Sequence, residues 1–195
     1  FDKVDTAKGT VTFTTDSCSP FVLARKAGVS VKGKVASYNG SHDFTVTLYQ
    51  AGSDTVVGTP LTVSGNGTVG STEQEFTIPN VAPGEYDLVV TKSAHLKYTV
   101  KNITVGNAPL DLTAMTGKAY QTITLLCGDI DGNGFINSTD LGIILKGQNY
   151  GKSTATAGDK AADLDGNGFI NSTDLGIVLQ GQHYGKSAVS VNFGG

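Results

Sequence analysis

The sequence predicts two domains, an all-β sandwich followed by a small all-α domain made of two loop–helix repeats. Apolar and polar residues alternate along several short segments between about residue 29 and residue 106, as in strands with one buried face. From residue 128 onwards, a stretch rich in Asp, Asn and Gly occurs twice, and each copy is followed by apolar residues at helical spacing. The 195 residues suffice for two small domains.

Composition and charge narrow the classes of function. The formal net charge is −3 and there is no basic block, so neither nucleic acid nor an anionic membrane surface is an expected partner. No apolar run approaches the roughly 18 residues of a membrane span. The chain is rich in Gly, Thr, Val, Ser and Asn and lacks Trp, as is common in extracellular β proteins. It begins with Phe1, which suggests a piece of a longer protein or a processed form.

Residues 1–27 form a separate segment. The stretch VTFTTDSCSPFVLARK predicts either the closing strands of an upstream module or a strand added to the sandwich. Two cysteines are too few for a disulfide scaffold. Cys18 and Cys127 form one disulfide or remain two ordinary thiols, and the sequence leaves both possibilities open.

Strands are expected across the sandwich, residues 28–127. Turn signals such as Asn39-Gly40 and Pro83-Gly84 separate the alternating segments. The alternation slips by one residue between 98–100 and 103–105, which indicates a bulge. Residues 119–126 predict a last strand that enters the repeats without a flexible linker. The apolar positions that alternate most clearly are Val29, Val31, Val35, Phe44, Val46, Leu48, Tyr86, Leu88 and Val90.

The repeats span residues 129–153 and 163–187 and are identical at 21 of 25 positions. In each copy, oxygen-bearing side chains fall at positions 1, 3, 5, 9 and 12 of a twelve-residue window, with Gly at position 6. This is the calcium-loop spacing of an EF-hand, in which position 7 contributes its backbone carbonyl. Two Ca²⁺ ions are therefore expected. The expected ligands are Asp129, Asp131, Asn133, Phe135, Asn137 and Asp140 in the first loop, and Asp163, Asp165, Asn167, Phe169, Asn171 and Asp174 in the second.

Each repeat departs from an ordinary EF-hand. The segments before the loops, QTITLLCG and TATAGDKAA, lack the apolar periodicity of an entering helix. Position 12 is Asp140 or Asp174 in place of the usual Glu. Only an exiting helix is expected in each repeat, so the units are half EF-hands. A calcium sensor that opens a groove between paired helices is disfavoured.

Two such units in tandem, with the motif D-x-D-G-N-G-x-I-N-S-T-D-L, resemble a dockerin. The segment FTIPNVAPGEYDLVVTKSAHLKYTVKNITV resembles the Ig-like or prealbumin-like modules of secreted bacterial proteins, which include the X-modules found beside dockerins. The resemblance implies an X-module–dockerin dyad, with the dockerin in residues 128–195. It also implies calcium-dependent binding to a cohesin, which attaches the parent protein to a scaffoldin or cell-surface anchor of an extracellular, cellulosome-like complex. The sandwich would be a stabilising spacer, and the chain alone a monomer.

The resemblance also implies which residues choose the partner. In dockerins these lie at loop positions 10 and 11 and on the exiting helix, and the near-identity of the two copies implies docking in either of two orientations. The sequence leaves open a second role for the same side chains. In that alternative Ser and Thr cap the helices, Leu lies in the core, and Tyr packs on the other repeat. The two orientations would differ in affinity through the positions at which the copies differ in polar side chains, Lys146/Gln180 and Asn149/His183. The expected partner-binding residues are Ser138, Thr139, Leu145, Lys146, Tyr150, Ser172, Thr173, Leu179, Gln180 and Tyr184.

No enzyme is expected, because the three histidines belong to no nucleophile or metal motif and the acids of the sandwich are scattered. The alternative to an assembly module is a carbohydrate-binding or adhesin module with calcium-stapled repeats. It requires aromatics aligned on one sheet face, for which Tyr38, Tyr49 and Tyr98 are the candidates. Residues 188–195 alternate again and are expected to return to the segment near Leu125–Leu126.

Overall fold

The computed structural model describes residues 3–5, 10–12 and 28–194. In the N-terminal part, β1 (Lys3–Asp5) and β2 (Thr10–Thr12) pair in an antiparallel hairpin. Cys18 lies outside the described residues, as does most of the segment predicted to serve an upstream module. Cys127 is a buried free thiol, and burial raises its pKa well above the usual range.

The larger sheet has five strands in the order β13-β8-β7-β4-β5. Neighbouring strands are antiparallel, except that β13 runs parallel to β8. The β7–β8 register shifts where the sequence alternation slips, so the predicted bulge is confirmed. The strand bounds are β4 (Phe44–Gln50), β5 (Val56–Val63), β7 (Gly84–Lys92), β8 (Tyr98–Val105) and β13 (Val189–Asn192).

The second sheet is built around β3 (Val29–Tyr38), which pairs antiparallel with β6 (Ser71–Val81). Two short strands, β9 (Leu110–Asp111) and β10 (Ile123–Thr124), lie parallel to the other edge of β3. The single-turn helix η1 (Leu112–Ala114) follows β9. Of the strand predicted at 119–126, only Ile123–Thr124 forms regular strand structure, because a turn closed by the Gln121 amide on the Lys118 carbonyl precedes it. The Leu125 amide continues the contact by donating to the Ala36 carbonyl at 2.9 Å.

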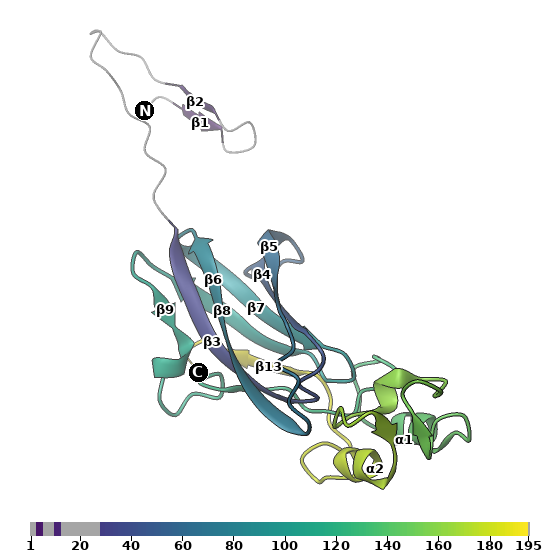
Figure 1. The fold of residues 1–195 in the computed structure, drawn as a ribbon. Coiled ribbons are helices and arrows are strands. Elements are labelled where there is room, and N and C mark those ends of the chain that lie inside the picture. Colours follow the sequence, from purple (N-terminus) through teal and green to yellow (C-terminus); the bar gives the residue numbers. More distant parts are fainter. Residues whose placement is uncertain (1–2, 6–9, 13–27, 195) are drawn as a thin grey trace, which may run out of the picture.

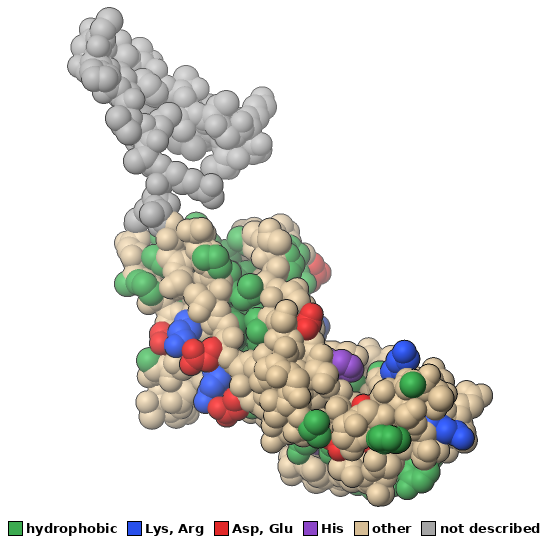
Figure 2. Space-filling model, in the orientation of Figure 1, with side chains coloured by type: hydrophobic (Ala, Val, Ile, Leu, Met, Phe, Trp, Pro, Cys, Tyr) green, Lys and Arg blue, Asp and Glu red, His purple; other side chains and the backbone are tan. Residues whose placement is uncertain are grey.

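The two sheets face each other across a shared hydrophobic core (Figure 1). In β3, buried and partly exposed positions alternate from Val31 to Ser37, as the apolar periodicity predicts. Gly33 lies under the Phe76 ring, where a Cβ atom would come within 2.3 Å of it. On the outer face, Lys32 and Lys34 form ion pairs across to Glu75 and Glu73 on β6. Figure 2 shows basic and acidic side chains next to one another on the sandwich. The expected mostly β-stranded region is confirmed.

The C-terminal domain, called the repeat domain below, contains two short helices, α1 (Ser138–Leu145) and α2 (Ser172–Val178). Each helix follows its loop directly, as predicted. The only helical turn between the repeats is the single-turn η2 (Lys160–Ala162), so neither described loop has an entering α-helix.

Each repeat forms backbone hydrogen bonds with the loop of the other repeat. After α1, β11 (Lys152–Ser153) pairs with β12 (Phe169–Ile170) in the second loop. After α2, the Gly185 amide donates to the Ile136 carbonyl at 2.8 Å, and Gly151 makes the same bond to Ile170 at 2.8 Å. Each loop is therefore completed by the segment that follows the helix of the other repeat, and the domain has pseudo-two-fold symmetry.

The repeat domain lies against one end of the sandwich (Figure 1). Its core contains Leu96 and Cys127 from the sandwich side together with Ile136, Ile144 and Ile170. The C-terminal segment does not pair with Leu125–Leu126, because β13 crosses back to the edge of the larger sheet and pairs there with β8. It packs on the core that contains Leu125, where Phe193 stacks on Tyr120. Among the described residues, no helix has the length and apolarity to cross a membrane.

Candidate metal sites and binding surface

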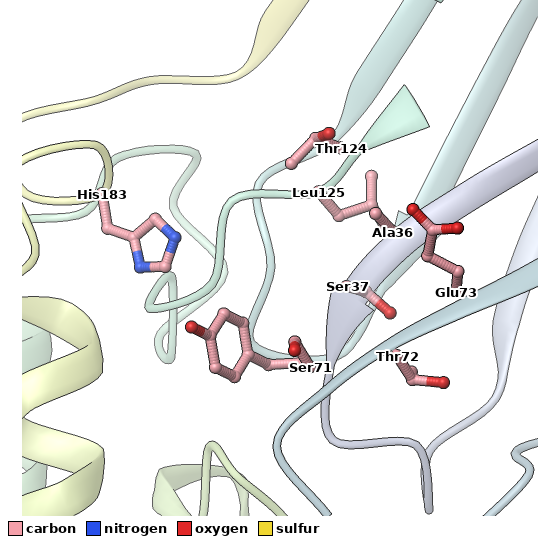
Figure 3. A pocket seen from close by; sticks show the side chains of 9 residues that line it. Ala36, Ser37, Ser71, Thr72, Glu73, Thr124, Leu125 and His183 are labelled. Atoms are coloured by element: carbon pink, nitrogen blue, oxygen red, sulfur yellow. The ribbon is translucent and has the colours of Figure 1, made fainter. Parts of the chain in front are cut away.

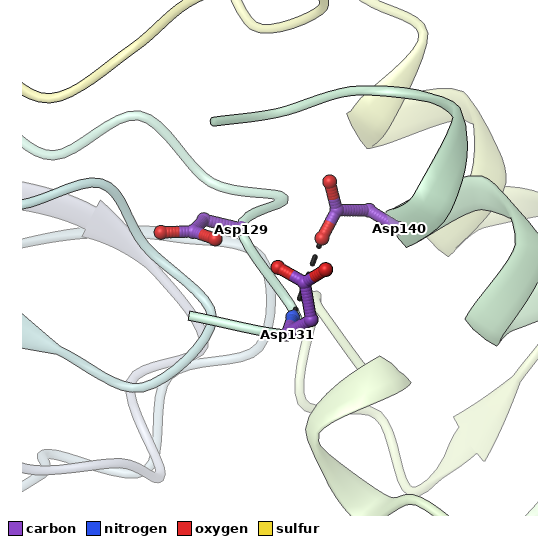
Figure 4. A group of neighbouring side chains, drawn as sticks. All are labelled: Asp129, Asp131 and Asp140. Atoms are coloured by element: carbon purple, nitrogen blue, oxygen red, sulfur yellow. Dashed lines mark hydrogen bonds between the residues drawn. The ribbon is translucent and has the colours of Figure 1, made fainter. Parts of the chain in front are cut away.

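Each loop of the repeat domain brings three carboxylates together. Asp129, Asp131 and Asp140 offer oxygens that lie within 4.8 Å of one another, and Asp163, Asp165 and Asp174 repeat the arrangement. Figure 4 shows the first cluster, with Asp129 and Asp131 on the loop and Asp140 on the first turn of α1. The three carboxylates, spread over twelve residues of sequence, therefore meet at one point in each loop.

The last carboxylate of each loop fixes the loop ends. One oxygen of Asp140 accepts from the Ile130 amide at 2.7 Å, and the other accepts from the Asn137 amide at 2.9 Å. Asp174 makes the equivalent bonds to Leu164 at 2.7 Å and Asn171 at 2.8 Å. Because these bonds already hold the shorter Asp side chain in the cluster, the absence of Glu at position 12 does not remove this carboxylate from the site.

Glycine at position 6 turns each loop back on its first carboxylate. Gly134 has φ +85° and Gly168 has φ +90°, in the left-handed region that favours glycine. Their amides donate to Asp129 Oδ2 at 3.0 Å and to Asp163 Oδ2 at 2.9 Å. A Cβ atom would meet nothing within 4 Å at either position, so backbone conformation and not space requires glycine here.

Electrostatics favours a bound cation in both clusters. Burial raises the pKa of Asp129, and the neighbouring Asp140 and Asp131 charges raise it further. Burial also raises the pKa values of Asp163 and Asp174, with a contribution from Asp165 to each. Carboxylates in such positions are stabilised as anions when a positive charge lies between them.

The donor set fits a hard cation. Asp129 Oδ1 is buried and has no hydrogen-bond partner, which is unusual for a buried carboxylate oxygen, and a cation at that point would satisfy it. All candidate ligands carry oxygen, the donor that Ca²⁺ prefers. When bound, Ca²⁺ would supply the positive charge that these carboxylates lack.

The other predicted ligands are held differently. Asn133 and Asn167 lie beside the clusters, donating to Asp131 and Asp165 at 2.9 Å. Asn137 and Asn171 are the helix N-caps, and their side-chain oxygens accept from the amides of Thr139 and Thr173, at 2.7 Å in each case. The side chains of Phe135 and Phe169 are each 57% exposed, which leaves their backbone carbonyls as the predicted ligand atoms.

The predicted partner-binding residues lie on the surface. Leu145 and Leu179 are 55% and 54% exposed, and Tyr150 and Tyr184 are 42% and 41% exposed. The alternatives that placed the leucines in the core and the tyrosines against the other repeat are therefore wrong. Figure 2 shows separate apolar side chains exposed on the repeat domain. Lys146 is exposed and Gln180 is partly exposed.

Positions 10 and 11 are also available to a partner. Ser138, Thr139, Ser172 and Thr173 are exposed, at the start of α1 and α2. The alternative that they cap the helices is wrong, because the Asn residue before each Ser-Thr pair is the N-cap.

Asn149 and His183 do not lie on this surface. Both are buried at the ends of the exiting helices, where Asn149 donates to the Ile143 carbonyl at 2.6 Å and His183 Nδ1 lies 2.8 Å from the Ile177 carbonyl. His183 also faces the edge of the Tyr38 ring, with ring centroids 5.8 Å apart. The prediction that this pair distinguishes two docking orientations by direct contact is therefore wrong.

His183 lines a pocket of about 270 Å³ between the two domains. In Figure 3 it enters from the repeat side, whereas Ala36, Ser37 and Thr72 lie on the strands. The aromatics that a carbohydrate-binding face would need are not aligned, since Tyr98 is buried and Tyr38 packs on His183. Asn39 and Gly70 contact the second loop, a role that the sequence did not indicate, since Asn39 was predicted only as part of a turn.

Comparisons with known proteins agree with this geometry. The model of the dockerin type I domain family matches residues 127–180. No curated protein sequence matches the chain. An N-terminal interface mutant of a type II cohesin–X-dockerin complex from Acetivibrio cellulolyticus contains a chain that is 25% identical, with a TM-score of 0.57, covering 83% of this chain and 98% of that one.

A C-terminal interface mutant of the same complex contains a chain of similar fold, with 24% identity, a TM-score of 0.56 and the same coverage of 83% and 98%. The match therefore extends over both the β-stranded region and the repeats, and the expected X-module–dockerin organisation is confirmed. In sequence, residues 127–180 match the dockerin type I domain family, and in structure the chain resembles an X-dockerin over both regions.

Proposed function

We propose that this chain is a non-catalytic, calcium-dependent assembly module whose dockerin binds a cohesin. The observation that carries the proposal is the pair of carboxylate-lined loops, each next to an exposed Ser-Thr, Leu and Tyr set. The similar solved structures are complexes of a cohesin with an X-dockerin. The complex would attach a parent protein to a scaffoldin or cell-surface anchor of an extracellular polysaccharide-degrading assembly.

In this proposal each loop holds one Ca²⁺ ion through the ligands predicted from the sequence. The ion offsets two of the three negative charges of the clustered carboxylates and holds the loop against its exiting helix. The sandwich, as an X-module of Ig-like or prealbumin-like type, acts as a stabilising spacer. Its shared core with the repeat domain supports that role, because burial of Leu96 and Cys127 depends on both domains.

We also propose two docking orientations. The two surfaces have nearly equal exposure at Leu145 and Leu179, and at Tyr150 and Tyr184. A rotation of about half a turn about the pseudo-two-fold axis would present either surface to the same cohesin face. Lys146 and Gln180 are the remaining polar difference between the two surfaces.

The test is calorimetric titration of the full chain against type I and type II cohesins, in calcium and in excess chelator. Both cohesin types are needed, because the family model is of type I and the similar complexes are of type II. The expected result is one-to-one binding to a cohesin that chelator abolishes. Absence of binding to every cohesin by a calcium-loaded, folded chain would refute the proposal.

Paired substitutions test the two orientations. Leu145→Ala with Tyr150→Ala disables one surface, and Leu179→Ala with Tyr184→Ala disables the other. Each pair alone should change affinity by less than about tenfold, whereas all four together should abolish binding, as expected when buried aromatic and aliphatic anchors are lost. A large loss from one pair alone would show a single orientation.

A further inference from the structure

The sandwich contacts the second metal loop at ligand residues. Asn39 Nδ2, at the end of β3, donates to the backbone carbonyl of Asp163 at 2.8 Å. The Gly70 amide, just before β6, donates to the carbonyl of Asp165 at 2.7 Å. Asp163 and Asp165 are the first two proposed ligands of that loop, so two groups of the sandwich fix the backbone from which the ligand side chains extend.

The first loop has no equivalent support. No hydrogen bond among the described residues ends on the carbonyl of Asp129 or Asp131. The nearest backbone bond from this end of the loop to the sandwich is made by Gly128, which donates to Ala94 at 2.8 Å and precedes the first ligand. Asp131 is exposed, whereas its counterpart Asp165 is buried. Two nearly identical loops are thus held in different surroundings.

The contact with Asn39 is tightly packed. Asn39 is 3% exposed, has φ 54°, and accepts from the Ser41 amide at 3.2 Å through Oδ1. Gly166 of the second loop lies so close that a Cβ atom there would be 2.5 Å from Asn39 Oδ1. At Gly132, the matching position of the first loop, a Cβ atom would meet nothing within 4 Å.

A loop held near its bound geometry before the ion arrives loses less conformational entropy on binding. We infer that the second loop binds Ca²⁺ more tightly than the first, with Asn39 and Gly70 as positioning groups supplied by the sandwich. By reciprocity, the ion in the second loop strengthens the junction between the domains, and the ion in the first loop does so less. This inference depends on the calcium binding in the proposed function.

A calcium titration of the full chain, followed by residue-resolved NMR, tests this order. The amides of Gly134 and Gly168 donate to the first carboxylate of their loops and report each site separately. Gly168 should respond at lower calcium concentration than Gly134. Asn39→Gly removes the side-chain bonds without backbone strain, because glycine accepts positive φ. It should weaken the second site by about 3- to 10-fold, the range expected for one hydrogen bond.

The matched control is Asn80→Gly. Asn80 has φ 56°, lies in the same sandwich and is exposed, so its substitution changes the backbone preference equally without touching the loop. The control should leave both sites unchanged. In Asn39→Gly, an unchanged Gly134 response shows that the repeat domain remains folded.

Two results overturn the inference while leaving the proposed function intact. One is simultaneous filling of both loops in the unmodified chain, and the other is an unchanged Gly168 response in Asn39→Gly. A chain in which neither glycine responds to calcium overturns the inference and the proposed function together. The Gly134 and Gly168 responses distinguish all three outcomes in the same calcium titration.

Discussion

A single added methyl group should distinguish the two metal loops. Gly166→Ala and Gly132→Ala alter the same position of each loop, at φ +76° and φ +72°. Both place alanine in the left-handed region, which costs about 1–2 kcal/mol. Only the Gly166 substitution meets Asn39, at 2.5 Å from its Oδ1. Asn39 must then leave its bonds to the Asp163 carbonyl and the Ser41 amide.

Loss of these two bonds in a buried position should add about 2 kcal/mol to the cost of Gly166→Ala, given about 1 kcal/mol for each bond. For a chain of this size, each kcal/mol lowers Tm by about 2–4 °C, so Gly166→Ala should unfold about 4–8 °C below Gly132→Ala. Thermal unfolding followed by circular dichroism, at saturating calcium and one pH, measures the difference.

Equal Tm values for the two variants would refute the reasoning, because the strain of a left-handed alanine would then account for the whole effect. A double-mutant cycle adds a second criterion. In an Asn39→Gly background the close contact is absent, so Gly166→Ala should cost no more than Gly132→Ala. If the full Tm difference between Gly166→Ala and Gly132→Ala persists in that background, another contact of the second loop causes it.

Three further predictions concern stability. Ile144 is fully buried and Leu145 is 55% exposed, so Ile144→Ala should lower the free energy of unfolding in urea by about 2–5 kcal/mol and Leu145→Ala by much less. Raised pKa values at Asp129 and Asp163 mean that folding favours their protonated forms, so metal-free protein should lose stability as pH rises above the unfolded value of 3.8. In calcium the slope should reverse, because protons compete with the ion; melting with and without chelator from about pH 4 to 7 compares the two. Burial lowers the pKa of Lys92 from 10.5 to about 8, so stability should rise over that pH range, and Lys92→Met should flatten the rise in chemical denaturation.

Local patterns in the sequence were sufficient for the repeated elements and for much of the sandwich. Alternation along β3 and β4 follows the burial of their side chains, because one face of each strand lies on the core. The loop spacing predicted the carboxylate clusters, because ligand positions in a tight loop are set by residues close in sequence. These features depend on short-range geometry.

The remaining features depend on contacts between distant residues. The strand β9 has two residues and no period to detect, and the pairing of β9 and β10 with β3 is visible only in the fold. The contact of Asn39 with Asp163 joins residues 124 positions apart. Two nearly identical repeats also predict identical environments for the two loops. The environments differ because the sandwich contacts one of them, the second loop, at its ligand residues.

The parallel pairing of β13 with β8 sets an order of events in folding. The two strands are separated in the chain by the whole repeat domain, so the edge of β8 cannot be covered until both repeats have been synthesised. During that interval β8 is an open sheet edge, which other chains can pair with. Its closure requires the repeats to bring residue 189 near Lys97, whose carbonyl accepts from the Val189 amide at 3.0 Å. With the calcium binding proposed above, the calcium concentration where the chain folds would therefore set how long this edge of β8 stays open.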